Sequence, residues 1–222
     1  MARIHLDASE TDALKELFNI GIGRAANALG QMVHDEVFLS VPEMAIVSRD
    51  EALELIVRHS AEQVAAIRQG FHGQFSGSAL LVYPESNSLE LVRSLLGEDI
   101  PLESLTELEQ ESLLEVGNVI LNACLGSFAN LMNLELTFDL PEFMKGQSQK
   151  LLAISSHDLT SSETPLIDDG HVVFLIVDFI TGDNTPKKHH IKGYVILLLD
   201  AVAVENLRQM IAKMLQGGGG GA

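Results

Sequence analysis

Two pairs of polar side chains, each a glutamate followed three positions later by an asparagine, interrupt stretches that are otherwise typical of apolar helices. The pairs are Glu16 with Asn19 and Glu115 with Asn118. Residues three apart on a helix share one face, so each pair places a carboxylate about one turn from a carboxamide. Asparagine is a mediocre helix former because its side chain competes for backbone hydrogen bonds. Its occurrence at two matching mid-helix positions therefore suggests a specific role.

The spacing of these residues indicates an internal duplication. The second pair follows the first by 99 positions, and Pro141 follows Pro42 by the same interval. A fixed interval between similar segments is the signature of a repeat and is best sought before any other feature. Each pair could still be only the solvated side of an amphipathic helix, and the repetition leaves both interpretations open.

The polar stripes extend beyond the pairs. Asp12 and Glu111 stand four positions before the two glutamates and again differ by 99. Small residues nearby predict that a neighbouring backbone approaches each helix closely: Gly21, Gly23 and Ala25 in the first, Gly117 and Gly126 in the second.

The composition limits the classes of protein to which the chain could belong. The chain has 222 residues, of which 46% are hydrophobic, as expected for a globular domain. Its net charge of -17 repels phosphate backbones and anionic membrane surfaces, so we expect neither nucleic acid nor a membrane as partner. The lone Cys124 indicates a reducing compartment and a buried hydrophobic role. The longest apolar run, Val172–Val177, is too short to span a bilayer, and we expect a cytoplasmic protein.

Other motifs in the sequence lack the surrounding structure or spacing that their functions require. Gly21–Ala26 has the Gly-x-Gly-x-x-Ala form of a dinucleotide-binding loop, but it lies inside a helical pattern instead of after a strand. Gly73–Gly77 resembles a nucleophile elbow with its serine one place too late. The eight histidines are scattered without metal-ligand spacing. We therefore expect neither a metal site nor a cofactor of the protein's own.

Hydrophobic periodicity predicts the elements in order. A first helix begins near Ser9 in a capping box with Asp12, and the long helix of the second half begins at Thr106 in a capping box with Glu109. The first helix is followed by strand 37–41, helix 50–58, strands 64–70 and 77–83, and helix 89–96. The second, which runs to about 131, is followed by strands 134–138, 151–155, 172–179 and 191–199, and helix 204–215, with 146–148 as a loop.

Each half thus has the order helix, strand, hairpin, helix. This order predicts an α+β fold in which two pseudo-two-fold related repeats share a largely antiparallel six-stranded sheet with packed long helices. We expect a single domain over residues 1–216, with repeat one at about 9–100 and repeat two at about 106–216. Residues 217–222, mostly glycine, are predicted to form a flexible tail.

The complete pattern resembles the CheC/CheX/FliY family of chemotaxis phosphatases. In that family a Glu-x-x-Asn pair follows an aspartate or serine by four positions and precedes a proline by some twenty. The resemblance extends through Leu215, and the two copies of the motif are most similar to the CheC branch. The matching residues are Asp12, Glu16, Asn19 and Pro42, then Glu111, Glu115, Asn118 and Pro141, with Glu111 departing from the family's aspartate or serine.

The resemblance implies hydrolysis of the aspartyl-phosphate on the response regulator CheY. It implies that Asn19 and Asn118 orient the attacking water and that Glu16 and Glu115 pair with a lysine of the regulator. The regulator would supply its own Mg²⁺. Two alternatives remain: an adaptor that binds and regulates the receptor deamidase CheD, and a scaffold at the flagellar switch.

Overall fold

The computed structural model describes residues 7–33, 36–59, 63–73, 76–96, 102–131, 133–150, 171–181, 189–199, 206–209 and 211–213. The named helices are α1 (Ala8–Val33), α2 (Arg49–His59), α3 (Glu85–Leu96) and α4 (Leu102–Leu131). The strands are β1 (Val37–Ser40), β2 (Met44–Ser48), β3 (Gln63–Gly73), β4 (Gly77–Pro84), β5 (Leu136–Phe138), β6 (Glu142–Gln147), β7 (His171–Thr181) and β8 (His189–Leu199).

The described strands join one antiparallel sheet, which confirms the predicted fold class. Its order is β1-β7-β8-β4-β3-β5, with β2 also paired to β7 and β6 also paired to β3. The sheet is therefore six strands wide but is built from eight strands. Pro42 separates β1 from β2, and Pro141 separates β5 from β6. Because proline has no backbone N–H to donate, it divides each edge strand in two.

The strand order is symmetric about the β8–β4 junction. In the register, Met44 lies opposite Leu175 and Phe143 lies opposite Ile67, and Met44 and Phe143 differ by the 99-residue interval. The edge strands of each half thus pair with the central hairpin of the other half. The predicted domain limits remain a prediction, since the tail and strand 151–155 lie outside the described residues.

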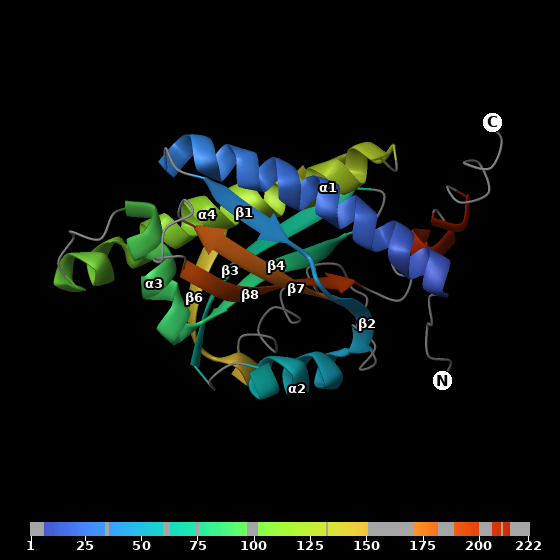
Figure 1. Cartoon of the computed structure of the whole chain (residues 1–222). Coiled ribbons are helices and arrows are strands. Elements are labelled where there is room, and N and C mark those ends of the chain that lie inside the picture. Colours follow the sequence, from blue (N-terminus) through green and yellow to red (C-terminus); the bar gives the residue numbers. More distant parts are fainter. Residues whose placement is uncertain are drawn as a thin grey trace.

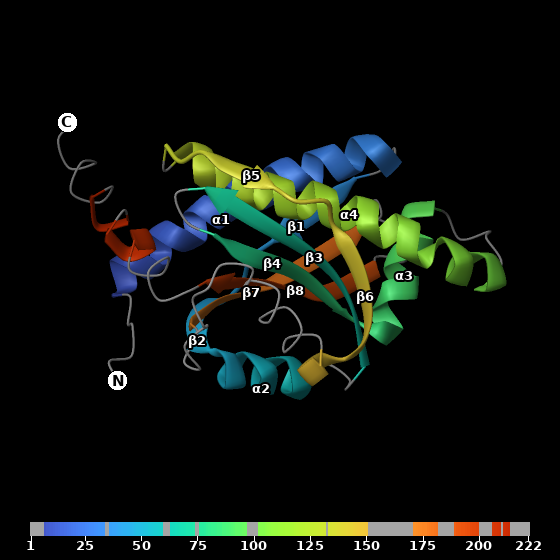
Figure 2. The same cartoon turned by 180° about the vertical axis from the view of Figure 1, so that it is seen from behind.

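Helices cover both faces of the sheet. Figures 1 and 2 show α1 and α4 side by side over one face and α2 on the other. Both faces carry buried cores, one beneath α1 and α4 and one that includes α2. Strands that are buried on both faces have nearly continuous apolar sequences. This burial explains the long hydrophobic runs of β4, β7 and β8.

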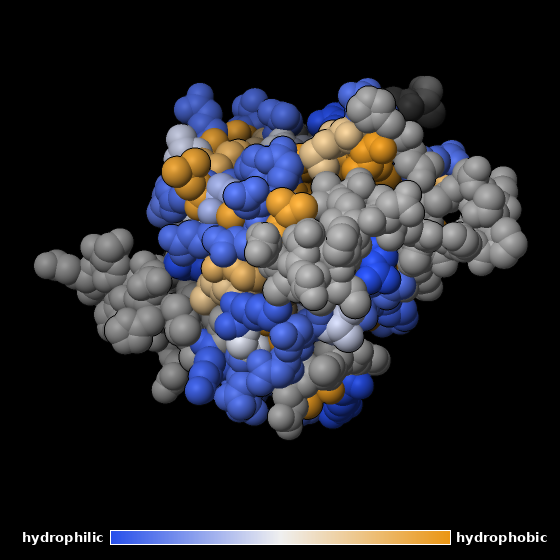
Figure 3. All heavy atoms as spheres, turned by 90° about the vertical axis from the view of Figure 1, so that its left-hand side faces the viewer, coloured by the Kyte–Doolittle hydropathy of each residue, from blue (hydrophilic) through white to orange (hydrophobic). Residues whose placement is uncertain are grey.

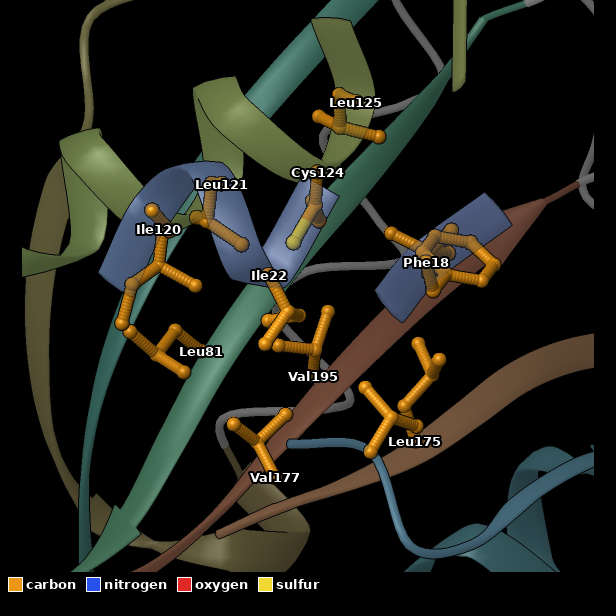
Figure 4. Packing of buried hydrophobic residues seen from close by; sticks show 14 of the residues in the cluster. Phe18, Ile22, Leu81, Ile120, Leu121, Cys124, Leu125, Leu175, Val177 and Val195 are labelled. Carbon is orange, nitrogen blue, oxygen red and sulfur yellow. The ribbon is translucent and has the colours of Figure 1, made fainter. Parts of the chain in front are cut away.

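The larger core lies where α1 and α4 cross above the sheet. Figure 4 shows Ile22 of α1 and Cys124 of α4 near Val195 of the sheet. The rings of Phe18 and Phe128 stack with their centroids 6.1 Å apart. Cys124 is 1% exposed, and burial raises the pKa of its thiol to about 12, which confirms its predicted hydrophobic role.

Segment Leu108–Asn130 of α4 is long and apolar enough to cross a membrane by length and composition alone. In this fold, 56% of its apolar window is buried inside the protein, against α1 and the sheet. Its hydrophobicity is thus explained by its position as a core helix.

Figure 3 shows the surface at the end of the molecule where α1 finishes. Among its coloured residues, hydrophilic ones (blue) predominate in the lower half of that face.

The predicted start of α1 near Ser9 agrees with the structure within one residue, but both predicted capping boxes and the predicted start of α4 are wrong. The reciprocal cap of α1 uses Asp7 and Glu10, because the Asp7 carboxylate accepts from the Glu10 backbone N–H at 2.8 Å and the Glu10 carboxylate accepts from that of Asp7 at 2.9 Å. Helix α4 begins at Leu102, so Thr106 lies inside it and does not cap it. In addition, β2 was not predicted, and β6 includes residues that were predicted as loop.

Candidate functional site

The first polar stripe lies on the exposed side of α1. Asp12 and Glu16 are exposed, and Asn19 is partly buried one turn further along. The backbone N–H of Val41 donates to Oδ1 of Asn19 at 3.2 Å. Val41 is buried, and the contact joins α1 to the segment that connects β1 and β2. The asparagine at this helical position therefore has a structural partner that an apolar residue could not satisfy.

A second contact holds the same connecting segment against α1. Nζ of Lys15 donates to the carbonyl oxygen of Pro42 at 2.6 Å. Two hydrogen bonds from consecutive residues of the connection, one at Val41 and one at Pro42, thus fix its position beside Asn19. This contact uses a backbone oxygen, so it holds the segment in place without requiring a proline there.

The second stripe lies on α4 in the equivalent order. Glu111 and Glu115 are exposed, and Asn118 is partly buried. Here Oδ1 of Asn118 accepts from Nδ2 of Asn122 at 2.7 Å, one turn along the same helix. Oδ1 of Asn122 in turn accepts from Nε2 of Gln69 on β3 at 3.1 Å. The second asparagine is therefore held by side chains and not by a backbone N–H.

Gln69 also connects α4 to the segment between β5 and β6. It is 2% exposed, and its Nε2 also donates to the backbone oxygen of Asp139 at 3.0 Å. Asp139 precedes Leu140, which is 88% exposed, and the half-buried Pro141. Sequence reasoning missed Gln69 and Asn122. The available signal was a glutamine within a mostly apolar strand and an asparagine four positions after Asn118.

The two sites share one chemical arrangement. In each, an exposed glutamate stands one turn before an asparagine whose carboxamide oxygen is already held. Among the described residues, neither Glu16 nor Glu115 has an ion-pair partner, and Nδ2 of neither asparagine has a hydrogen-bond partner. An exposed carboxylate suits a cationic group of a partner, and a fixed carboxamide suits a small polar molecule such as water.

The described residues give no support for a cysteine nucleophile, a nucleotide-binding loop or a metal site. The thiol of Cys124 is buried with a pKa of about 12, so it is not a nucleophile near neutral pH. Gly21–Ala26 lies well inside α1 and does not begin a helix, so it cannot form a phosphate-binding loop. The described residues contain no group of three or more His, Cys, Asp or Glu side chains that could hold a metal ion.

Comparison of the sequence with known proteins agrees with the resemblance. No protein-family model matches the chain. The chain is 29% identical over 136 residues to the CheY-P phosphatase CheC of Bacillus subtilis (strain 168), an alignment that covers 60% of this chain and 65% of that protein. It is 29% identical over 94 residues to the flagellar motor switch phosphatase FliY of the same organism, covering 42% of this chain and 24% of FliY. The chain thus spans less than two thirds of either relative.

Solved structures share the fold. FliY of Thermotoga maritima superposes with a TM-score of 0.67 at 18% identity, covering 95% of this chain and 99% of that one. The FliM middle domain from H. pylori superposes with a TM-score of 0.57 at 10% identity, covering 92% and 99%. The resemblance to the CheC/CheX/FliY family is therefore confirmed in sequence relatives and in fold.

Proposed function

We propose that this protein is a CheC-like phosphatase that hydrolyses the aspartyl-phosphate of a CheY-type response regulator. The observation that carries the proposal is the twin arrangement on α1 and α4, an exposed glutamate followed by an asparagine with a held carboxamide. A relative named CheY-P phosphatase CheC and a relative named flagellar motor switch phosphatase FliY support it. The further expectation of a cytoplasmic location belongs to the same proposal.

The proposed chemistry requires only positioning. An acyl phosphate is already activated, so a water in line with the bond from phosphorus to the aspartate oxygen is sufficient. The water oxygen bonds to phosphorus as the bond to the aspartate oxygen breaks, and the water proton passes to the released phosphate. The products are inorganic phosphate and a free aspartate on the regulator.

The two residue types divide the work in this mechanism. The carboxamide of Asn19 or Asn118 fixes the water, because an amide donates and accepts hydrogen bonds without titrating near neutral pH. The oxygen that is already held keeps a second lone pair, and Nδ2 keeps its donors. Glu16 or Glu115 pairs with a lysine of the regulator and so brings the asparagine to the phosphate. The Mg²⁺ of the regulator carries charge in the transition state.

The test is phosphate release from a phosphorylated CheY-type regulator in the presence of Asn19→Ala, Asn118→Ala and the double variant. Loss of both water-positioning groups is expected to reduce the acceleration by about 10²-fold or more. Asn27→Ala is the matched control, since Asn27 is an exposed asparagine on α1 about two turns beyond Asn19, too far away to hold the same water, and its loss is expected to leave the rate unchanged. Wild-type acceleration by the double variant contradicts the mechanism.

The adaptor alternative makes a different prediction in the same assay. An adaptor would bind its partner, with CheD as the expected protein, and would not accelerate release from any regulator. Wild-type protein that captures CheD but leaves the phosphorylated regulator unchanged would replace the phosphatase proposal with this one.

A further inference from the structure

The two sites are equivalent in their glutamates and asparagines but differ in what holds the asparagine. The 99-residue interval relates Asn122 of α4 to Gly23 of α1. The sheet register relates Gln69 of β3 to Val177 of β7, since Ile67 and Leu175 occupy matching positions opposite β6 and β2. Both members of the polar contact in the second half are thus replaced in the first, one by glycine and one by valine.

The replacement matches a difference between the segment that connects β1 to β2 and the segment that connects β5 to β6. In the first half, the backbone N–H of Val41 reaches Asn19 directly. Its counterpart in the second half, Leu140, is 88% exposed, whereas Val41 is 2% exposed. In the second half, Gln69 connects α4 to the segment between β5 and β6. Its Nε2 donates to Oδ1 of Asn122 on the helix and to the backbone oxygen of Asp139 in that segment.

We infer that Asn122 is a positioning residue for Asn118, that Gln69 anchors it, and that this amide relay serves the second site alone. The inference rests on the proposed function and adds that the two sites are built differently.

Burial favours a specific role for the relay. Gln69 is 2% exposed, and its Oε1 has no hydrogen-bond partner among the described residues. A buried amide with an unsatisfied oxygen costs free energy that an apolar residue at this position would avoid. The valine at the matching position of β7 shows that the fold accepts an apolar residue there. The glutamine therefore fits a site requirement better than a packing requirement.

The experiment isolates each site. Asn19→Ala leaves only the second site and Asn118→Ala leaves only the first, and Asn122→Ala or Asn122→Asp is added to both. The Asp variant keeps the shape of Asn122 but cannot donate to Asn118 when ionised. We expect both changes to lower kcat of the second site by about tenfold with little change in KM, because the carboxamide loses its orientation. Neither change is expected to alter the first site.

Asn130→Ala is the matched control, because Asn130 is an exposed asparagine on α4 outside the relay and its loss is expected to change neither site. A second readout does not need turnover. In the ¹⁵N spectrum, the side-chain NH₂ signals of Asn122 are expected to shift in Asn118→Ala, and those of Asn118 in Asn122→Asp, but not in Asn130→Ala.

The outcomes separate the two claims. If wild type does not accelerate phosphate release, the proposed function fails, and the NH₂ signals alone decide whether the relay exists. If the second site works and Asn122→Asp leaves its kcat unchanged, the inference is overturned while the function stands. An equal loss at both sites would also overturn it, since that result indicates a general effect on stability. NH₂ signals that do not shift overturn it whatever the activity.

Discussion

The carboxamides of Asn19 and Asn118 occupy equivalent positions but receive different donors. A backbone N–H holds Asn19, and a side chain that can itself be substituted holds Asn118. The first orientation depends on the path of the chain at Val41, and the second depends on residues from two other positions in the sequence. A duplicated arrangement can therefore keep the same pair of side chains while the residues that hold them diverge.

The glutamates lead to a prediction about docking. Because Glu16 and Glu115 are exposed, each would form its ion pair with the regulator near solvent, where such pairs contribute about 0.2–1 kcal/mol. Replacing both by glutamine is therefore expected to raise KM for the phosphorylated regulator by up to about fivefold per site. It should also weaken the dependence of KM on salt. Steady-state phosphate release at two ionic strengths measures both effects.

Glu135→Gln is the matched control for this docking experiment. Glu135 is exposed between α4 and β5, and its substitution removes one negative charge, as each single glutamate replacement does, without touching either stripe. A rise in KM of equal size in Glu135→Gln would show that general charge, and not a local ion pair, governs docking.

The sequence predicted the candidate site residues that occur in both repeats. It did not predict the residues that occur in only one. Glu16, Asn19, Glu115 and Asn118 were found because their interval is constant. Gln69 and Asn122 are 53 positions apart and meet only through the sheet and helix packing. No periodicity in the sequence encodes such a contact, and their counterparts in the first half are not polar.

At the scale of elements, the crossing of α1 and α4 depends on one glycine. A Cβ at Gly21 would lie 2.8 Å from the Cα of Cys124 and 3.0 Å from the backbone oxygen of Ala123. Both obstacles are backbone atoms and cannot rotate away. Gly117 is similarly close to the side chain of Ile67, whereas the predicted close approach was wrong for the remaining two glycines of the stripes, Gly23 and Gly126.

This contrast gives a prediction within a single helix. Gly21→Ala is expected to destabilise the fold by about 1–3 kcal/mol, because the overpacking exceeds the helix-propensity gain of about 1 kcal/mol. Gly23→Ala is the control, since nothing lies within 4 Å of its Cβ and it is expected to stabilise by up to about 1 kcal/mol. Urea unfolding monitored by circular dichroism measures both. Equal stabilisation by the two variants would contradict the close crossing.

Elements with strong periodicity were predicted well, and those defined by pairing were not. The long apolar strands β3, β4, β7 and β8 and the amphipathic α1 follow directly from their patterns. The short edge strands β2 and β6 are partly exposed. β2 has only four apolar residues before a serine, and β6 mixes polar with apolar residues. Their conformation is set by pairing with β7 and β3, which are distant in sequence, so local pattern could not identify them.

Across the whole molecule, an ionic cluster connects elements from both halves. Nζ of Lys145 on β6 lies 2.9 Å from Oε2 of Glu109 on α4 and 3.2 Å from Oε1 of Glu85 on α3. Ser88 of α3 donates to the other oxygen of Glu109 at 2.5 Å. Glu109 is 4% exposed, so its charge needs these partners. The glutamate that sequence reasoning assigned to a helix cap instead joins α4 to α3 and β6.

The cluster makes stability depend on pH. Burial opposes the charge of Lys145, but hydrogen bonds and attraction from Glu109 and Glu85 outweigh it and raise the pKa of Lys145 above its ordinary value of 10.5. A lysine with a raised pKa in the folded state contributes stability that is fully present below the unfolded pKa. That contribution is lost as the pH rises through the folded pKa. The cluster is therefore intact at neutral pH and weakens only in strong alkali.

Lys145→Met is accordingly expected to lower the free energy of unfolding at pH 7 by about 1–3 kcal/mol, because it leaves the buried Glu109 charge with only Ser88. Partial exposure of Lys145 keeps the loss below that of a fully buried pair. Urea unfolding at pH 7, 9 and 11 should show a constant gap to wild type at the first two values and a smaller gap at the third. Lys192→Met, at an exposed lysine on β8 without an ion pair among the described residues, is the control and should show little change. A gap that widens towards pH 11 would mean that the protonated lysine does not stabilise this junction.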